Sequence, residues 1–133
     1  IGEVEQQLAA AGLEKGRLIF SPHLLPTDRG ILAAIYAPVK DMQQAISAIQ
    51  QAYRDEPLIN LLPEGELASL AHVVLSPYTA ISLTPASENS LIIMLAIDNL
   101  LKGAASQALQ NFKLMFGFDE TTALLSANPR DRS

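Results

Sequence analysis

Residues 79–97 read TAISLTPASENSLIIMLAI. The apolar runs Thr79–Thr84 and Leu91–Ile97 flank a polar segment, a pattern typical of a β-hairpin. A long helical pattern follows, with Asp98 as its N-cap and Gly117 as its stop after Phe116. The expected apolar face of this helix contains Leu101, Ala104, Ala105, Ala108, Phe112 and Met115. A hairpin that leads into an amphipathic helix predicts helices packed on a β-sheet.

The segments before the hairpin predict two more helices. Val4, Leu8 and Ala11 recur at helical spacing before Gly12, which indicates a short surface helix. A second helix is expected after the N-cap Asp41. Its apolar stripe consists of Met42, Ala45, Ile46, Ile49 and Tyr53.

The same region predicts further strands. Ile31–Ala37 is apolar with β-branched and aromatic members, so we expect a strand that is buried on much of both faces. Shorter strands are expected at Arg17–Phe20, Leu58–Leu62 and Val73–Leu75, and a turn at Pro63-Glu64-Gly65. The prolines and glycine of residues 21–30 indicate an extended segment and a turn. Together these elements predict an α+β fold, a mixed and mainly antiparallel sheet with helices on one face.

Composition narrows the function classes. The chain has 133 residues, of which 49% are hydrophobic and 17% charged, so it suits one folded domain or a piece of a larger chain. The net charge of −5 offers no basic surface for nucleic acid. No apolar run approaches the length of a membrane helix and no leader is visible, so we expect a cytoplasmic protein. The first residue, Ile1, leads us to expect a trimmed or processed chain.

The residue types available for chemistry are few. There is no cysteine, which excludes a thiolate metal site and a cysteine nucleophile within this chain. The two histidines, His23 and His72, lack partners at metal-ligand spacing, so we expect no metal. His23 lies between two prolines and is either a site residue or a partly buried histidine bound to the backbone. Arg29, beside Gly30, is either a guanidinium aimed at a carboxylate or phosphate, or part of a surface ion pair.

The start of the long helix is a second candidate. A helix N-terminus presents free N–H groups, and here Asn99 and Lys102 lie in its first turns with Gly103 and two alanines after them. The small residues would admit a polar ligand close to the backbone. The alternative is a capped helix whose small residues pack tightly on another element.

Two segments in this order resemble one enzyme family. FSPHLLPTDRGILA (residues 20–33) and AIDNLLKGAASQALQN (residues 96–111) are similar to signature stretches in the C-terminal half of N-acetyl-gamma-glutamyl-phosphate reductase, and LPEG (62–65) and LMFG (114–117) also fit. The resemblance covers about Gly2 to Leu125. It implies the C-terminal part of an enzyme that reduces N-acetyl-gamma-glutamyl phosphate with NADPH to the semialdehyde in arginine biosynthesis.

The resemblance also assigns parts of the chain. It implies a substrate and dimerisation domain at residues 1–97, similar to that of glyceraldehyde-3-phosphate-dehydrogenase-like and semialdehyde-dehydrogenase-like enzymes. Residues 98–118 would be a helix that docks on a Rossmann domain, and residues 119–133 a polar tail. The family's nucleotide loop, catalytic cysteine and histidine lie upstream, so the resemblance implies no catalytic residue in this chain. The implied partners are that N-terminal half, a small-molecule substrate and further copies of the chain in a dimer or tetramer.

Residue by residue, Asn99 is similar to the family's asparagine near the nicotinamide carboxamide, and Lys102 and Gly103 lie in the same turn, which implies NADP binding there. Arg29 and His23 would border the substrate pocket. Two positions depart from the family pattern. Thr27 replaces the usual methionine, and Val74-Leu75-Ser76-Pro77 stands where the family commonly has Arg-Gly-Ser/Thr-Asn.

Two alternatives to this reductase stay open. One is a stand-alone dimerisation or binding module that keeps the fold and has lost catalysis, with Val74–Pro77 as its mark. The other is a related reductase that acts on aminoadipyl phosphate in lysine biosynthesis. If the last helix docks on a separate domain, its apolar face should be exposed in the isolated chain and make that chain oligomeric or marginally stable.

Overall fold

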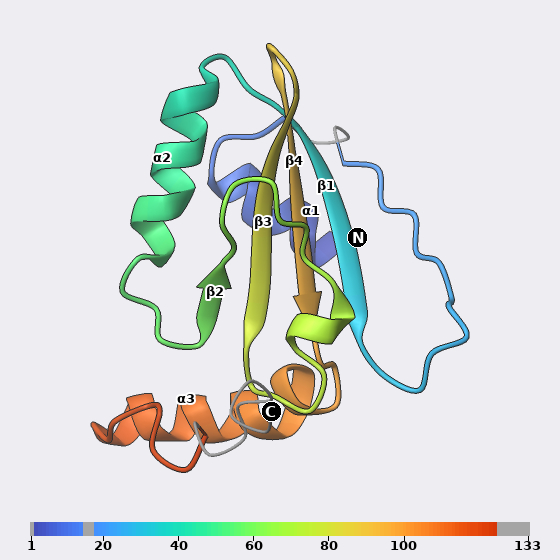
Figure 1. Ribbon diagram of the computed structural model, residues 1–133. Helices are drawn as coiled ribbons and strands as arrows, with labels where there is room; N and C mark the ends of the chain where they lie inside the picture. The colour runs from blue at the N-terminus through green and yellow to red at the C-terminus, as the bar shows by residue number, and fades with distance from the viewer. Residues whose placement is uncertain (1, 15–17, 125–133) are drawn as a thin grey trace.

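The computed structural model describes residues 2–14 and 18–124 (Figure 1). The elements follow the chain in this order: α1 (Gly2–Ala10), β1 (Ile31–Pro38), α2 (Met42–Tyr53), β2 (Ile59–Leu61), the 3₁₀ turn η1 (Leu70–His72), β3 (Thr79–Ser87), β4 (Ser90–Ile97), the π-helical turn η2 (Leu101–Ala105) and α3 (Ser106–Phe116). Helices mixed with sequential strands confirm the α+β class. Within the part of the chain that the structure describes, no helix is long and apolar enough to cross a membrane.

The sheet has four strands in the order β1-β4-β3-β2. The two pairs that involve β4 are antiparallel, whereas β2 runs parallel to β3, so the sheet is mixed and mainly antiparallel as predicted. The predicted hairpin is confirmed, with Thr84 opposite Ile92 and an irregularity between Pro85 and Ser87. Strand β4 is therefore central, and its end leads directly into the last helix.

The two faces of the sheet are covered differently. Alternation along β3 directs Leu83 and Pro85 toward α2, while Ala80 and Ser82 point to the opposite face. Figure 1 shows α1 behind the strands and the η1 segment in front of them, while α3 runs across one end of the sheet. On the front face the Ser82 hydroxyl accepts a hydrogen bond from the Ala68 backbone N–H at 3.0 Å. The segment 62–76 thus covers that face of the sheet.

Small side chains let this segment lie close to the sheet. The buried cluster consists of Ala68, Val73, Ala80 and Ala96, with Leu62, Leu70 and Met94 packed against it. Gly30, which precedes β1, also approaches closely: a Cβ at this position would lie 2.5 Å from Leu70 Cδ2, and the residue has φ +104°. Only glycine satisfies both conditions at this point.

The predicted burial of the first strand is wrong. Strand β1 forms where expected, but Ile31, Ile35 and Tyr36 are 50%, 47% and 72% exposed. The reason is its place at the edge of the sheet, where β4 is its only neighbour among the described strands. An apolar edge strand of this kind is suited to contact with another chain or domain.

Two predicted short strands are absent. Leu18–Phe20 is not a strand, and Arg17 lies outside the described residues. Val73–Leu75 forms a turn after η1, in which the Ser76 N–H donates to the Val73 carbonyl at 3.0 Å. Leu75 has φ 61°, in the left-handed region, which is incompatible with a strand. In contrast, β2 confirms the strand expected at Leu58–Leu62, and Gly65, with φ +86°, lies in the expected turn.

The last helix begins later than predicted. The Asp98 side chain accepts hydrogen bonds from the N–H groups of Leu100 and Leu101, so it caps the turn as expected, but η2 intervenes before α3 starts at Ser106. Gly117, with φ 72°, ends the helix as predicted.

The face that α3 buries is polar, contrary to the packing that its apolar pattern suggests. Ser106, Gln110 and Lys113 are buried, whereas Phe112 and Met115 are 50% and 80% exposed. Residues 119–124 turn back toward this polar side, and Leu124 is buried. The apolar face of α3 is therefore exposed, and docking of this helix on another domain stays a prediction.

The close approach at Gly30 predicts a difference between two glycine variants. Gly30→Ala places a methyl group in contact with the Leu70 side chain and strains the backbone, whereas Gly65→Ala adds only backbone strain because nothing lies within 4 Å. Urea unfolding should show a loss of about 1 kcal/mol for Gly65→Ala and about 1 to 3 kcal/mol more for Gly30→Ala. Equal losses would contradict the packing described here.

Candidate functional site

A buried carboxylate organises the end of strand β4. Asp98 is fully buried and binds through both oxygens. Its Oδ1 accepts from the backbone N–H groups of Leu100 at 3.0 Å and Leu101 at 3.2 Å. Its Oδ2 accepts from the Leu75 N–H at 2.8 Å and from Arg29 Nη1 at 3.3 Å. One side chain therefore joins the helix start, the turn after η1 and the segment before β1.

These contacts fix the charge of Asp98. Burial alone would raise the pKa of this carboxyl group, but the hydrogen bonds from Leu75, Leu101, Arg29 and Leu100 outweigh burial and hold the pKa below its ordinary value. A carboxylate with a depressed pKa stabilises the folded state above the pKa of the unfolded chain. That stabilisation is lost as the pH falls through the lower, folded pKa.

Asn99 makes a second link to the same segment. Its Oδ1 accepts a hydrogen bond from the Gly30 backbone N–H at 2.6 Å. Because the amide oxygen faces Gly30, the NH₂ group of Asn99 points elsewhere, and no hydrogen bond to it is found among residues 2–14 and 18–124. Two consecutive residues at the helix start thus bind two consecutive residues before β1. We call these contacts, Arg29–Asp98 and Gly30–Asn99, the clamp.

A concavity of about 320 Å³ lies beside the clamp. It brings together three of the five candidates from the sequence, His23, Arg29 and Asn99. His23 is exposed and its Nδ1 lies 2.9 Å from the Ser21 carbonyl oxygen, so it contacts the backbone without the burial considered for it. Arg29 retains 32% side-chain exposure despite its ion pair. The remaining lining residues are Leu24, Leu25, Thr27, Asp28, Gly30, Ile31 and Leu32.

The other two candidates do not line this concavity. Lys102 Nζ donates to Gln110 Oε1 at 2.7 Å, and Gln110 Nε2 donates to Glu120 Oε2 at 2.6 Å. Burial lowers the pKa of Lys102, and the nearby charges of Glu120 and Glu56 partly offset that effect. Gly103 is exposed, and a Cβ there would meet only Asn99 Cβ at an ordinary 3.8 Å. Cofactor contact by Lys102 and Gly103 therefore stays a prediction.

His72 has a structural environment. Its Nδ1 accepts from the Ser69 N–H at 3.1 Å, and its Nε2 lies 2.9 Å from Glu66 Oε1. These contacts close the turn η1 in the manner of a capping box. In the described part of the chain, no three His, Cys, Asp or Glu side chains form a group that could hold a metal ion.

Sequence reasoning missed the main role of Asp98. It predicted a helix cap, and the structure adds an ion pair and a link to Leu75. The signal lay in Arg29, for which the sequence left two alternatives, a guanidinium aimed at a carboxylate or phosphate, or part of a surface ion pair. That carboxylate belongs to the chain itself, 69 positions away, and spacing cannot reveal such a pair.

The clamp predicts a change in acid sensitivity. Asp98→Asn removes the buried charge and leaves Arg29 without its charged partner. The free energy of unfolding at pH 7, measured with urea, should therefore fall by about 3 kcal/mol. The fall of stability as the pH drops below the ordinary aspartate pKa of 3.8 should also become shallower, because position 98 no longer carries a carboxyl group that takes up a proton on acid unfolding. The exposed residue Asp28 supplies the control, since Asp28→Asn should leave both quantities nearly unchanged. An unaltered acid slope in Asp98→Asn would refute this role.

The chain is similar to a known domain family and to curated enzymes that share one name. The family model described as "Semialdehyde dehydrogenase, dimerisation domain" matches residues 1–99. A protein from Citrifermentans bemidjiense, called N-acetyl-gamma-glutamyl-phosphate reductase, is 44% identical over 128 residues, which cover 93% of this chain and 37% of that protein. The protein of the same name from Cellvibrio japonicus is 43% identical over 129 residues, again with 37% of its length covered.

A third relative of that name, from Clostridium kluyveri, is 40% identical over 126 residues. The chain spans 37% of the length of these curated relatives. The resemblance stated from the sequence is therefore confirmed, and the aligned region includes both signature segments that the clamp joins. With a family model matched over residues 1–99, the chain belongs to the semialdehyde dehydrogenase dimerisation domain family.

Proposed function

We propose that this chain is the substrate-handling and dimerisation part of an NADP-dependent reductase of N-acetyl-gamma-glutamyl phosphate, acting in the cytoplasm in arginine biosynthesis. The names of the relatives support this substrate. The clamp is the observation that carries the proposal. It fixes the segment of His23 and Arg29 against the helix start that carries Asn99, beside one concavity.

The proposed roles follow from the free groups at the concavity. Arg29 uses one of its five N–H donors on Asp98, and its exposed remainder supplies positive charge for an anionic acyl phosphate. The NH₂ group of Asn99 is a donor suited to a carbonyl oxygen such as that of the nicotinamide carboxamide. His23 would border the substrate. When bound, NADPH supplies the hydride. The residues of this chain would bind and orient the substrate and the cofactor.

The nucleophile would come from another part of the protein, because this chain has no cysteine. We propose that an N-terminal nucleotide-binding half contributes it and covers the exposed face of α3. That face carries Leu109, Phe112 and Met115, with 38%, 50% and 80% exposure. Phe112 and Phe116 also contact each other at a ring-centroid distance of 4.7 Å. Exposed apolar side chains gathered on one face of a helix favour a protein partner.

The second expected partner is a further copy of the chain. The family description supports self-association. Strand β1 presents exposed apolar side chains at the sheet edge, with Leu32 and Tyr36 on the same face as the η1 segment. We propose that this region contributes to a dimer or tetramer.

The departure at Val74–Pro77 favours the non-catalytic module as the alternative. Leu75 has φ 61°, a backbone conformation that glycine adopts without strain. The resemblance places a glycine at this position in the family pattern. Its N–H nevertheless binds Asp98 at 2.8 Å, so the backbone geometry there is compatible with the clamp. This contact supports retention of the site, whereas Val74 and Pro77 replace the arginine and asparagine of the family pattern.

Activity with two substrates tests the proposal. The complete protein, assayed by NADPH consumption, should reduce N-acetyl-gamma-glutamyl phosphate with a kcat/KM at least about tenfold above that for the aminoadipyl analogue, corresponding to about 1.4 kcal/mol of transition-state discrimination. The reverse preference would identify the lysine-pathway alternative. A stable dimer without turnover of either substrate would identify the non-catalytic module.

Lys102 offers a test of the cofactor site. Lys102→Ala in the complete enzyme should lower kcat/KM by tenfold or more, because it removes a cation from the first turns of the helix. The control is Gln110→Met, which breaks the same hydrogen bond at 2.7 Å without removing that charge. If both variants lose the same stability and neither loses catalytic efficiency, Lys102 has only a structural role.

A further inference from the structure

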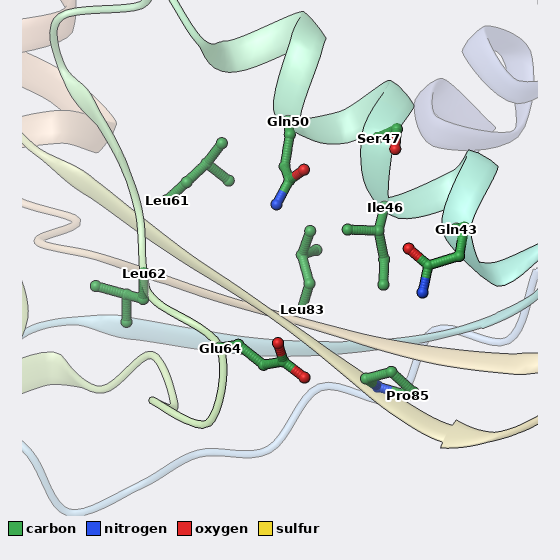
Figure 2. A pocket seen from close by; sticks show the side chains of 9 residues that line it. All are labelled: Gln43, Ile46, Ser47, Gln50, Leu61, Leu62, Glu64, Leu83 and Pro85. Atoms are coloured by element: carbon green, nitrogen blue, oxygen red, sulfur yellow. The ribbon is translucent and has the colours of Figure 1, made fainter.

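A second cavity lies between α2 and the sheet, away from the clamp. It has a volume of about 230 Å³. Figure 2 shows Gln43 and Gln50 extending from α2 toward β3, with Glu64 directed into the same gap from the segment after β2. The full lining is Gln43, Ile46, Ser47, Gln50, Leu61, Leu62, Glu64, Leu83 and Pro85.

The polar side chains of this cavity are open to solvent and therefore free to meet a ligand. In residues 2–14 and 18–124, no hydrogen bond or ion pair is found for the side chains of Gln43, Ser47, Gln50 or Glu64. The lining contains no lysine, arginine or histidine, so Glu64 is its only charged group. The cavity therefore offers one carboxylate, two amide oxygens and a hydroxyl over an apolar floor that includes Ile46 and Leu83.

The backbone holds Glu64 in place. Pro63, Glu64 and Gly65 form the turn predicted from the sequence, in which the Glu66 N–H donates to the Pro63 carbonyl at 3.1 Å. Gly65 has φ +86°, which allows the chain to reverse there. The function proposed above makes no use of this motif, although it was part of the family resemblance.

We propose that this cavity binds a small organic cation, a primary ammonium on a short apolar chain. The Glu64 carboxylate pairs with the ammonium and accepts one of its three N–H groups. The Gln43 and Gln50 amide oxygens and the Ser47 hydroxyl are the acceptors available for the other two, and Ile46, Leu83 and Pro85 contact the apolar chain. The volume equals that of about seven or eight water molecules at about 30 Å³ each, which suits an amine of five or six carbons. The site is independent of the clamp and of the proposed reductase activity.

Titration of the complete protein with n-pentylammonium, followed by ligand-observed NMR, tests this site. Saturable binding is expected, with affinity at least tenfold above that of n-pentanol and with no binding of pentanoate. Glu64→Gln should raise the Kd for n-pentylammonium tenfold or more. Glu88→Gln removes the same charge from the exposed β3–β4 turn and should leave the Kd unchanged.

Ser47→Trp provides a second variant, because it adds a large side chain to the cavity lining and keeps Glu64 unchanged. It should abolish binding. The proposal is overturned if n-pentylammonium does not saturate, if pentanol binds equally well, or if Glu64→Gln and Glu88→Gln have the same effect. Each result is read from ligand binding, so it does not depend on reductase activity.

Discussion

The buried carboxylate of Asp98 is the constraint on which the arrangement of this end of the molecule depends. A buried charge without partners is costly, and here four donors from three segments surround it: Arg29, Leu75, Leu100 and Leu101. These four hydrogen bonds bring the loop before β1, the turn after η1 and the start of the last helix together. The left-handed conformation of Leu75 fits the same requirement, since its N–H points at Asp98 at 2.8 Å.

This constraint explains how one small sheet can present a site. Strands position Asp98 at the end of β4, and Asn99 then binds the Gly30 N–H at 2.6 Å. The groups proposed to meet substrate and cofactor therefore sit on two segments that cannot move independently. The apolar side chains exposed on α3 and β1 are the surfaces at which we propose contact with a second domain and a second copy.

Local patterns predicted most of the fold. The hairpin, the helix capped by Asp41 and the Gly117 stop followed from periodicity and capping chemistry, because these depend on neighbours in sequence. The prediction that β1 is buried was wrong, since apolar composition does not distinguish an edge strand from a central one. Val73–Leu75 is not a strand, because its backbone N–H groups donate hydrogen bonds to the Leu70 carbonyl and to Asp98. Of the candidate site, Arg29, His23 and Asn99 were singled out from residue chemistry, and the roles that the resemblance implies for them stay predictions. The Arg29–Asp98 pair depends on tertiary placement alone.

Native-state hydrogen exchange measures the central claim most directly. If Asp98 holds three segments as one unit, the amides of Gly30, Leu75, Leu100 and Leu101 should open with similar free energies, although they lie far apart in sequence. Asp98→Asn should then lower the protection of all four together. Loss of protection confined to Leu100 and Leu101, with Gly30 and Leu75 unchanged, would contradict the account and reduce Asp98 to a local helix cap.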